Sequence, residues 1–229
     1  MIMTRLLAGT ALLALMPTVG AAKVVDFEIV SQSPAYEGQS FADAGTYERI
    51  DAIATIALDP TSERARNIVG LDSVPLNDDG MVTFTAEVAI LRPATGSGSG
   101  TLFYEVVNRG RNLSFQGLNL AKAGAGFDIS DPGDGFLMNR GHTVVWSGWQ
   151  THLPDDFLNL TLPVQEGVTG NSREQFIFDD TETVSTGALT YPAASLDPAA
   201  ATLTVRATTD GAPTTPEGLS FRYINEQTI

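Results

Sequence analysis

The residues with the clearest chemical potential are Asn108-Arg109-Gly110-Arg111, where a run of strand-forming residues ends abruptly. A strand that ends in a sharp, glycine-containing turn exposes backbone N–H groups at the carboxyl edge of a sheet, where open α/β sheets bind ligands. Such N–H groups can stabilise the negative charge that develops on a substrate oxygen during acyl transfer. We therefore predict an oxyanion loop over residues 108–111. The alternative is a simple turn that Gly110 permits, with solvated or ion-paired arginines.

The elements that would position this loop are two apolar segments and a short helix between them. In residues 101–108 and 143–149, apolar side chains occur at both odd and even positions. This pattern is typical of strands covered on both faces. Phe136, Leu137 and Arg140 fit the end of a short helix, with Gly141 as its left-handed C-terminal cap. A strand, a helix and a strand in this order predict a right-handed crossover between two parallel neighbours.

Two further residues follow the second of these strands and are candidates to line the same site, Trp149 and His152. Each also has an ordinary structural interpretation. Trp149 lies three residues after Trp146, and core burial is the commoner use of such a pair. A loop histidine without an identified partner is commonly only solvated.

The rest of the chain reads mainly as strands. Apolar alternation predicts strands at 23–30, 47–58 and 81–93, before the two segments described above. From residue 151 onward we find no helical pattern, and we expect short strands at 157–164, 174–180, 201–208 and 219–224. The predicted fold class is therefore α/β with a large β-rich portion. The α/β core would span residues 23–150, and an all-β insertion or layer would span residues 151–229.

The first 22 residues have the layout of a secretory signal peptide: an early positive charge at Arg5, an apolar run from Leu6 to Met16, Pro17, and small residues up to Ala22. The apolar run is shorter than the roughly 18 residues that a stable membrane span needs. We therefore expect an exported protein, periplasmic or extracellular, with cleavage near Ala21 or Ala22.

Charge and composition exclude several classes of function. Removing residues 1–22 leaves 12 basic residues (13 minus Arg5) and 27 acidic ones, a formal charge of −15. This charge argues against nucleic acid as a partner, because phosphate binding needs basic residues. The chain has no cysteine, which excludes disulfides, thiolate metal sites and a cysteine nucleophile. Asp128, Asp131 and Asp134 lack the spacing of a calcium-binding loop. We predict no metal and no cofactor.

Four segments together carry a resemblance to a known family: "SFADAGTYERIDAIATIALDP", "VTFTAEVAILRP", "LFYEVVNRGRN" and "GFLMNRGHTVVWSGWQ". In this order and spacing they resemble the N-terminal portion of the large, often exported bacterial "alpha/beta hydrolase domain" family. The resemblance implies a partial α/β-hydrolase-like core sheet and hydrolysis of an ester or related acyl bond. It also implies a longer chain, with a nucleophile elbow and catalytic triad beyond Ile229.

The chain itself has no identifiable nucleophile or base for that reaction. It contains no Gly-x-Ser-x-Gly segment, and its two histidines, His142 and His152, lie too early to follow a serine and an acid in the α/β-hydrolase order. We therefore expect this chain alone to be inactive. Its partners would be the missing C-terminal portion of the same chain and, in the full-length protein, a small-molecule ester-like substrate. The alternative is a non-catalytic, exported, β-rich binding or structural module.

Overall fold

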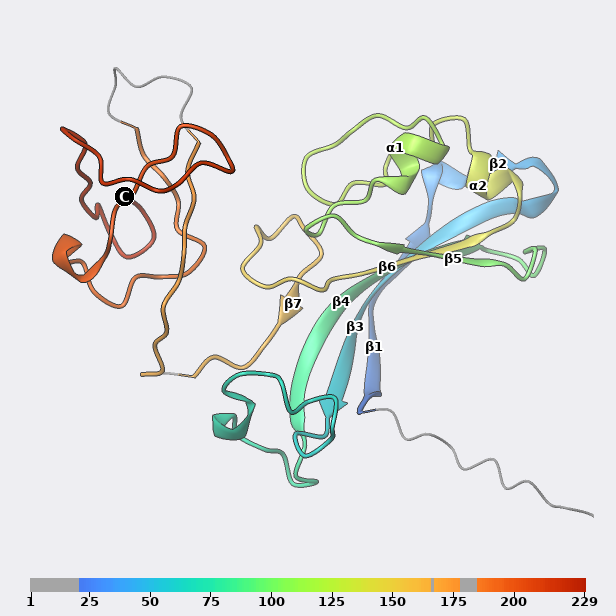
Figure 1. Ribbon diagram of the computed structural model, residues 1–229. Helices are drawn as coiled ribbons and strands as arrows, with labels where there is room; N and C mark the ends of the chain where they lie inside the picture. Colours follow the sequence, from blue (N-terminus) through green and yellow to red (C-terminus); the bar gives the residue numbers. More distant parts are fainter. Residues whose placement is uncertain (1–20, 166, 178–184) are drawn as a thin grey trace, which may run out of the picture. The chain divides into compact units, whose positions relative to one another are not determined.

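The computed structural model describes residues 21–165, 167–177 and 185–229 (Figure 1). The chain divides into two compact units, with the boundary between Gln165 and Glu166. Apart from Ala21 and Ala22, the predicted signal peptide lies outside the described residues, as do residues 178–180 of the strand predicted at 174–180.

A seven-stranded sheet forms the framework of the first unit. Five strands follow the order β1-β3-β4-β6-β5, while β2 pairs with β3 and β7 pairs with β4. Every pairing is antiparallel except that of β5 with β6. The strands are β1 (Ala22–Pro34), β2 (Ser40–Phe41), β3 (Gly45–Leu58), β4 (Val82–Pro93), β5 (Leu102–Val106), β6 (Thr143–Ser147) and β7 (Leu160–Thr161).

The long strands form where the apolar alternation predicted them. In the β3–β4 ladder, Ile50 pairs with Ile90, Ala52 with Val88 and Ala54 with Ala86. These even-numbered residues of β3 and β4 therefore share one face of the sheet. The strands predicted at 23–30, 47–58 and 81–93 are confirmed, and β1 is longer than its apolar pattern indicated.

The predicted parallel pair is also confirmed. Residues 102–106 of β5 pair in parallel with residues 143–147 of β6. The connection between them contains the helix α2 (Phe136–Asn139), which ends before Gly141 at φ 67°. This positive φ is the left-handed conformation that a glycine after a helix adopts without strain.

The predicted fold class is wrong. The described residues form a mostly β protein with two short α-helices, α1 (Ser114–Leu118) and α2, together with the 3₁₀ turns η1 (Tyr36–Gly38), η2 (Ala42–Ala44), η3 (Leu71–Ser73) and η4 (Pro198–Ala200). The sheet thus lacks the helical layers of an α/β-hydrolase-like core. None of the helices in this described part is long and apolar enough to cross a membrane.

Aspartate side chains explain why residues 128–136 of the β5–β6 connection form turns. Asp128, Asp131 and Asp134 each accept a hydrogen bond from the backbone N–H two residues further on, at 2.8 to 2.9 Å. Such local bonds offer the backbone an alternative to the helical hydrogen-bond ladder. The connection therefore folds as a series of turns, and only short helices remain.

The core of the first unit lies on one face of the sheet, beneath both helices. Tyr47, Leu91, Val144 and Trp146 project from three neighbouring strands into one buried cluster, together with Phe115 of α1 and residues of α2. Figure 1 shows α1 and α2 on the same side of β5 and β6. The expectation that β5 is covered on both faces is wrong, because Leu102, Tyr104 and Val106 are 61%, 49% and 69% exposed.

The second unit lacks the predicted all-β character. Within residues 167–177 and 185–229 the structure shows only isolated bridges, such as Val205 with Thr214 and Ala188 with Thr228, and the single 3₁₀ turn η4. The strands expected at 201–208 and 219–224, and in the described part of 174–180, do not form. Their apolar residues have no partner strand to pack against, and Ile177, Leu219 and Ile224 remain exposed.

Candidate functional site

The turn at residues 108–111 directly follows β5. Asn108 and Arg111 exchange two backbone hydrogen bonds, of 2.8 and 3.1 Å. Both central residues have positive φ, 48° at Arg109 and 80° at Gly110, which is the signature of a type I′ turn. In this left-handed region the Cβ atom of a residue other than glycine crowds the following carbonyl oxygen, which costs roughly 1–2 kcal/mol. The backbone of Arg109 is therefore locally strained.

Gly110 packs closely against the loop that follows β6, at residues 153–158. Its carbonyl oxygen accepts a 3.1 Å hydrogen bond from the Leu158 N–H. A Cβ atom at position 110 would lie 2.7 Å from Phe157 Cβ and 2.8 Å from Leu153 Cδ1. Only glycine therefore fits this position, and the contact fixes the turn against residues 153–158.

The two central N–H groups of the turn have no hydrogen-bond acceptor among the described residues. The N–H groups of Asn108 and Arg111 are used within the turn itself. Across the described residues, the N–H groups of Arg109 and Gly110 donate no hydrogen bond. Arg109 is exposed, and Gly110 is buried. Because β5 and β6 run in parallel, the turn lies at the carboxyl end of this pair, as predicted from the sequence.

The carboxylate of Glu105 organises the segment that follows the turn. Its Oε1 accepts hydrogen bonds from the N–H groups of Leu113 and Ser114, at 2.5 and 3.1 Å. Its Oε2 accepts from the Ser114 hydroxyl and from Trp146 Nε1, the latter at 2.6 Å. The sequence patterns above did not predict a role for Glu105. The available signal was a lone carboxylate at a core-facing position, in register with Trp146, on an otherwise apolar strand.

Trp149 and His152 lie on the loop after β6. Trp149 Nε1 donates a 2.5 Å hydrogen bond to the Val107 carbonyl, while its side chain stays 51% exposed. Trp149 is therefore beside the turn and accessible, whereas Trp146 is fully buried. His152 is exposed and has a φ of 58°. The structure thus brings Trp149 to the candidate oxyanion loop and places His152 on the adjoining loop.

A groove of about 390 Å³ begins where this loop meets the sheet. Phe157 lines the groove, and the Arg111 guanidinium lies over its ring, 5.1 Å from the ring centre. On the other wall, Arg49 lies 5.9 Å from the Phe127 ring centre and forms a 2.9 Å ion pair with Asp51. The remaining lining residues are Val30, Ala52, Ile53, Glu87, Val88, Asp155, Asp156 and Leu158.

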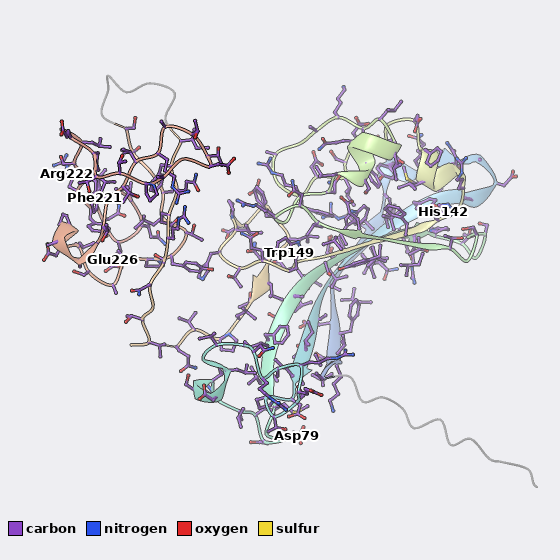
Figure 2. All side chains as sticks on the ribbon, viewed as in Figure 1. Asp79, His142, Trp149, Phe221, Arg222 and Glu226 are labelled. Carbon is purple, nitrogen blue, oxygen red and sulfur yellow. The ribbon has the colours of Figure 1, made fainter. Side chains whose placement is uncertain are left out.

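A serine–histidine pair lies at the other end of the same two strands. Ser99 Oγ and His142 Nδ1 are 2.9 Å apart. Ser99 Oγ also contacts the Gly141 carbonyl oxygen, at 3.1 Å, and accepts from the Thr101 N–H. None of the described carboxylates hydrogen-bonds to His142. Figure 2 shows His142 well away from Trp149. The pair therefore secures the loop before β5 and lies apart from residues 108–111.

The geometry offers no metal centre in the described part of the chain, where no group of three histidine or acidic side chains could hold an ion. In the loop that contains Asp128, Asp131 and Asp134, the carboxylates bind backbone N–H groups, as Asp131 illustrates. Its two carboxylate oxygens accept from the Lys122 and Gly133 N–H groups, and these hydrogen bonds lower the pKa of Asp131.

Comparisons with the profiles of protein families, with curated proteins and with solved structures find no match to this chain. The site must therefore be interpreted from its own geometry.

Proposed function

We propose that the first unit belongs to an exported protein that hydrolyses an ester or related acyl bond, and that the 108–111 turn supplies its oxyanion donors. The observation that carries this proposal is the pair of unengaged N–H groups at Arg109 and Gly110, at the carboxyl end of the β5–β6 pair. A strained, non-glycine residue such as Arg109 is also more frequent at functional sites than elsewhere.

Rigidity of the turn supports this role. Oxyanion stabilisation is effective when the donors are fixed before the reaction, since no free energy is then spent on reorienting them. The turn is held by its own two hydrogen bonds and by the Leu158 N–H bond to the Gly110 carbonyl. The Trp149 bond to Val107 and the Glu105 bonds to Leu113 and Ser114 fix the residues on either side.

The nucleophile and base of this reaction would come from outside the present residues. Ser99 and His142 approach each other at the amino end of β5 and β6, whereas the candidate oxyanion loop lies at the carboxyl end. We therefore infer that a further C-terminal portion of the same chain completes the site, that the substrate is a small ester-like molecule, and that the present chain is inactive by itself.

The test begins with the coding sequence downstream of codon 229. The longest encoded product is assayed on p-nitrophenyl esters, together with a variant in which the serine of its Gly-x-Ser-x-Gly segment is replaced by alanine. We expect turnover that depends on this serine. A stop codon at position 230, or a longer product without such a segment and without turnover, would overturn the proposal.

A second candidate function is a non-catalytic, β-rich binding module. The groove of about 390 Å³ favours it, because two phenylalanine rings and several carboxylates line it without any catalytic pair. Each ring already contacts an arginine, Arg49 at Phe127 and Arg111 at Phe157, so an organic cation would bind through the lining carboxylates of Asp155 and Asp156. Titration of the purified chain with benzylamine, with benzoate as the matched control, tests this function. Saturable binding of benzylamine alone is expected, and equal or absent binding of both would contradict it.

A further inference from the structure

One face of the first unit's sheet carries an apolar band across five strands, and we call it the open face. It is the face opposite the core cluster, because its residues alternate with Tyr47, Leu91 and Trp146 along the strands. Register pairing places its residues side by side: Phe27 and Ile29 of β1; Ile50, Ala52 and Ala54 of β3; Val88 and Ile90 of β4; Val145 of β6; and Leu102, Tyr104 and Val106 of β5.

The two edges of the open face expose large side chains. On β1, Val24, Phe27 and Ile29 are 60%, 44% and 54% exposed. On β5, Leu102, Tyr104 and Val106 are 49% to 69% exposed. On the strands between them, Ala52, Ala54 and Val88 form a buried cluster against Ile90 and Val145. Ala52 and Ala54 of β3 are the smallest side chains that we assign to the face, and they lie beside Ile29 and Phe27 of β1.

Charge is segregated away from the open face. The acidic residues Asp26, Glu28, Asp51 and Glu87 all have register positions on the opposite face. The open face holds one ion pair at its end, in which Arg92 Nε lies 2.6 Å from Glu48 Oε1. The chain as a whole has a formal charge of −14. A face without unpaired charge on so acidic a chain can be desolvated at little electrostatic cost.

We propose that a second copy of this chain covers the open face, so that two sheets pack face to face. The exposed surface is large enough for this. At roughly 200 Å² for a fully exposed large apolar residue, the exposed fractions of the six edge side chains correspond to about 670 Å² per copy and about 1,350 Å² in a pair. Stable specific interfaces bury roughly 1,200–2,000 Å² in total, so this area suffices for a dimer.

The profile of the face also suits a copy of itself. In a two-fold interface each patch meets the same patch on its partner, so that a self-complementary surface makes every contact twice. The large edge side chains of one copy can pack over Ala52 and Ala54 of the other. Sheets that pack in this way lie about 10 Å apart, with side chains of both inner faces interdigitated.

Sedimentation of the purified chain from about 1 to 100 µM tests the proposal. We expect a mass of two chains, which dissociates on dilution. Val106→Lys places a charge on the open face and is expected to weaken the dimer roughly 100-fold or more. Val69→Lys is the matched control, because Val69 is 99% exposed on the loop between β3 and β4 and is not one of the residues of the open face, and it should leave the dimer unchanged.

Ile29→Lys, on the opposite edge, provides a second test if Val106→Lys fails to fold. Near-ultraviolet circular dichroism identifies which variant retains the packed core. A wild-type chain that stays monomeric at 100 µM would overturn the proposal. So would a dimer that a folded Val106→Lys or Ile29→Lys variant forms as tightly as the wild type.

Discussion

The indole of Trp146 donates a 2.6 Å hydrogen bond to the carboxylate of Glu105, its register partner on the neighbouring parallel strand. Through the same carboxylate, β5 and β6 are linked to the start of α1, since Glu105 also accepts from Leu113 and Ser114. One side chain thus connects the fully buried tryptophan of the core with the segment that follows the candidate oxyanion loop.

Glu105→Gln should destabilise the first unit by about 2 kcal/mol. All groups that contact this carboxylate are donors, so a glutamine amide would place its own N–H groups against them and leave donors unpaired. Urea denaturation followed by tryptophan fluorescence measures the change. Glu63→Gln, at an exposed position without such bonds, should change the unfolding free energy by less than about 0.5 kcal/mol. Equal effects of both substitutions would contradict the role of Glu105.

Gly110→Ala should cost more stability than Gly100→Ala. Both glycines have positive φ, 80° and 73°, so both substitutions carry the backbone cost of about 1 kcal/mol. Only at Gly110 would the new Cβ meet neighbours, at 2.7 Å from Phe157 Cβ. We expect an additional loss of roughly 1–3 kcal/mol from this overpacking. A Gly110→Ala variant as stable as Gly100→Ala in urea would show that the 153–158 loop does not enclose the turn.

Two tyrosines of the core should respond in opposite ways to loss of the hydroxyl group. The Tyr47 hydroxyl contacts the carbonyl oxygens of Met138 and His142, at 3.1 and 3.0 Å. The Tyr36 hydroxyl is buried without a hydrogen-bond partner among the described residues. Tyr47→Phe should therefore destabilise by about 1 kcal/mol, and Tyr36→Phe should be neutral or stabilising. Thermal unfolding of the two variants checks this, and a reversed order would contradict it.

Alkaline pH should destabilise the fold through Tyr47. Burial raises the pKa of Tyr47 from its ordinary value of 10.0 to about 12. Because the unfolded chain then releases its proton more readily than the folded chain, the stabilisation is fully present below pH 10 and is lost as the pH rises through about 12. Urea midpoints at pH 8, 10, 11 and 12 measure the loss. Tyr47→Phe should show a smaller loss over this interval, and an identical profile would contradict the assignment.

Strand positions in the first unit could be predicted because their apolar alternation is long and regular. The same reasoning correctly placed α2, its Gly141 cap and the parallel β5–β6 pair. The fold class could not be obtained in this way. The sequence predicts a helical crossover between the two strands, but only two short helices form there, and aspartate-capped turns occupy residues 128–136.

The limits of sequence patterns are also visible in the second unit and at the site. Alternating residues such as those at 201–208 resemble a strand, yet a strand forms only where a partner is available, and there only the bridge of Val205 with Thr214 exists. At the site, the glycine-containing turn was found from sequence because its residue types are diagnostic. Glu105 was not, since its role depends on donors that lie eight to 41 positions away.

Exchange of the Gly110 amide for an ester tests the central claim most directly. Glycolic acid, introduced at position 110 of the longest gene product by stop-codon suppression, removes the N–H and adds no side chain. We predict a fall of roughly 100- to 1,000-fold in kcat on p-nitrophenyl esters, with little change in KM. The same exchange at Gly100, where an added Cβ would meet no atom within 4 Å, should leave kcat unchanged. An unaltered kcat after the exchange at Gly110 would contradict the account.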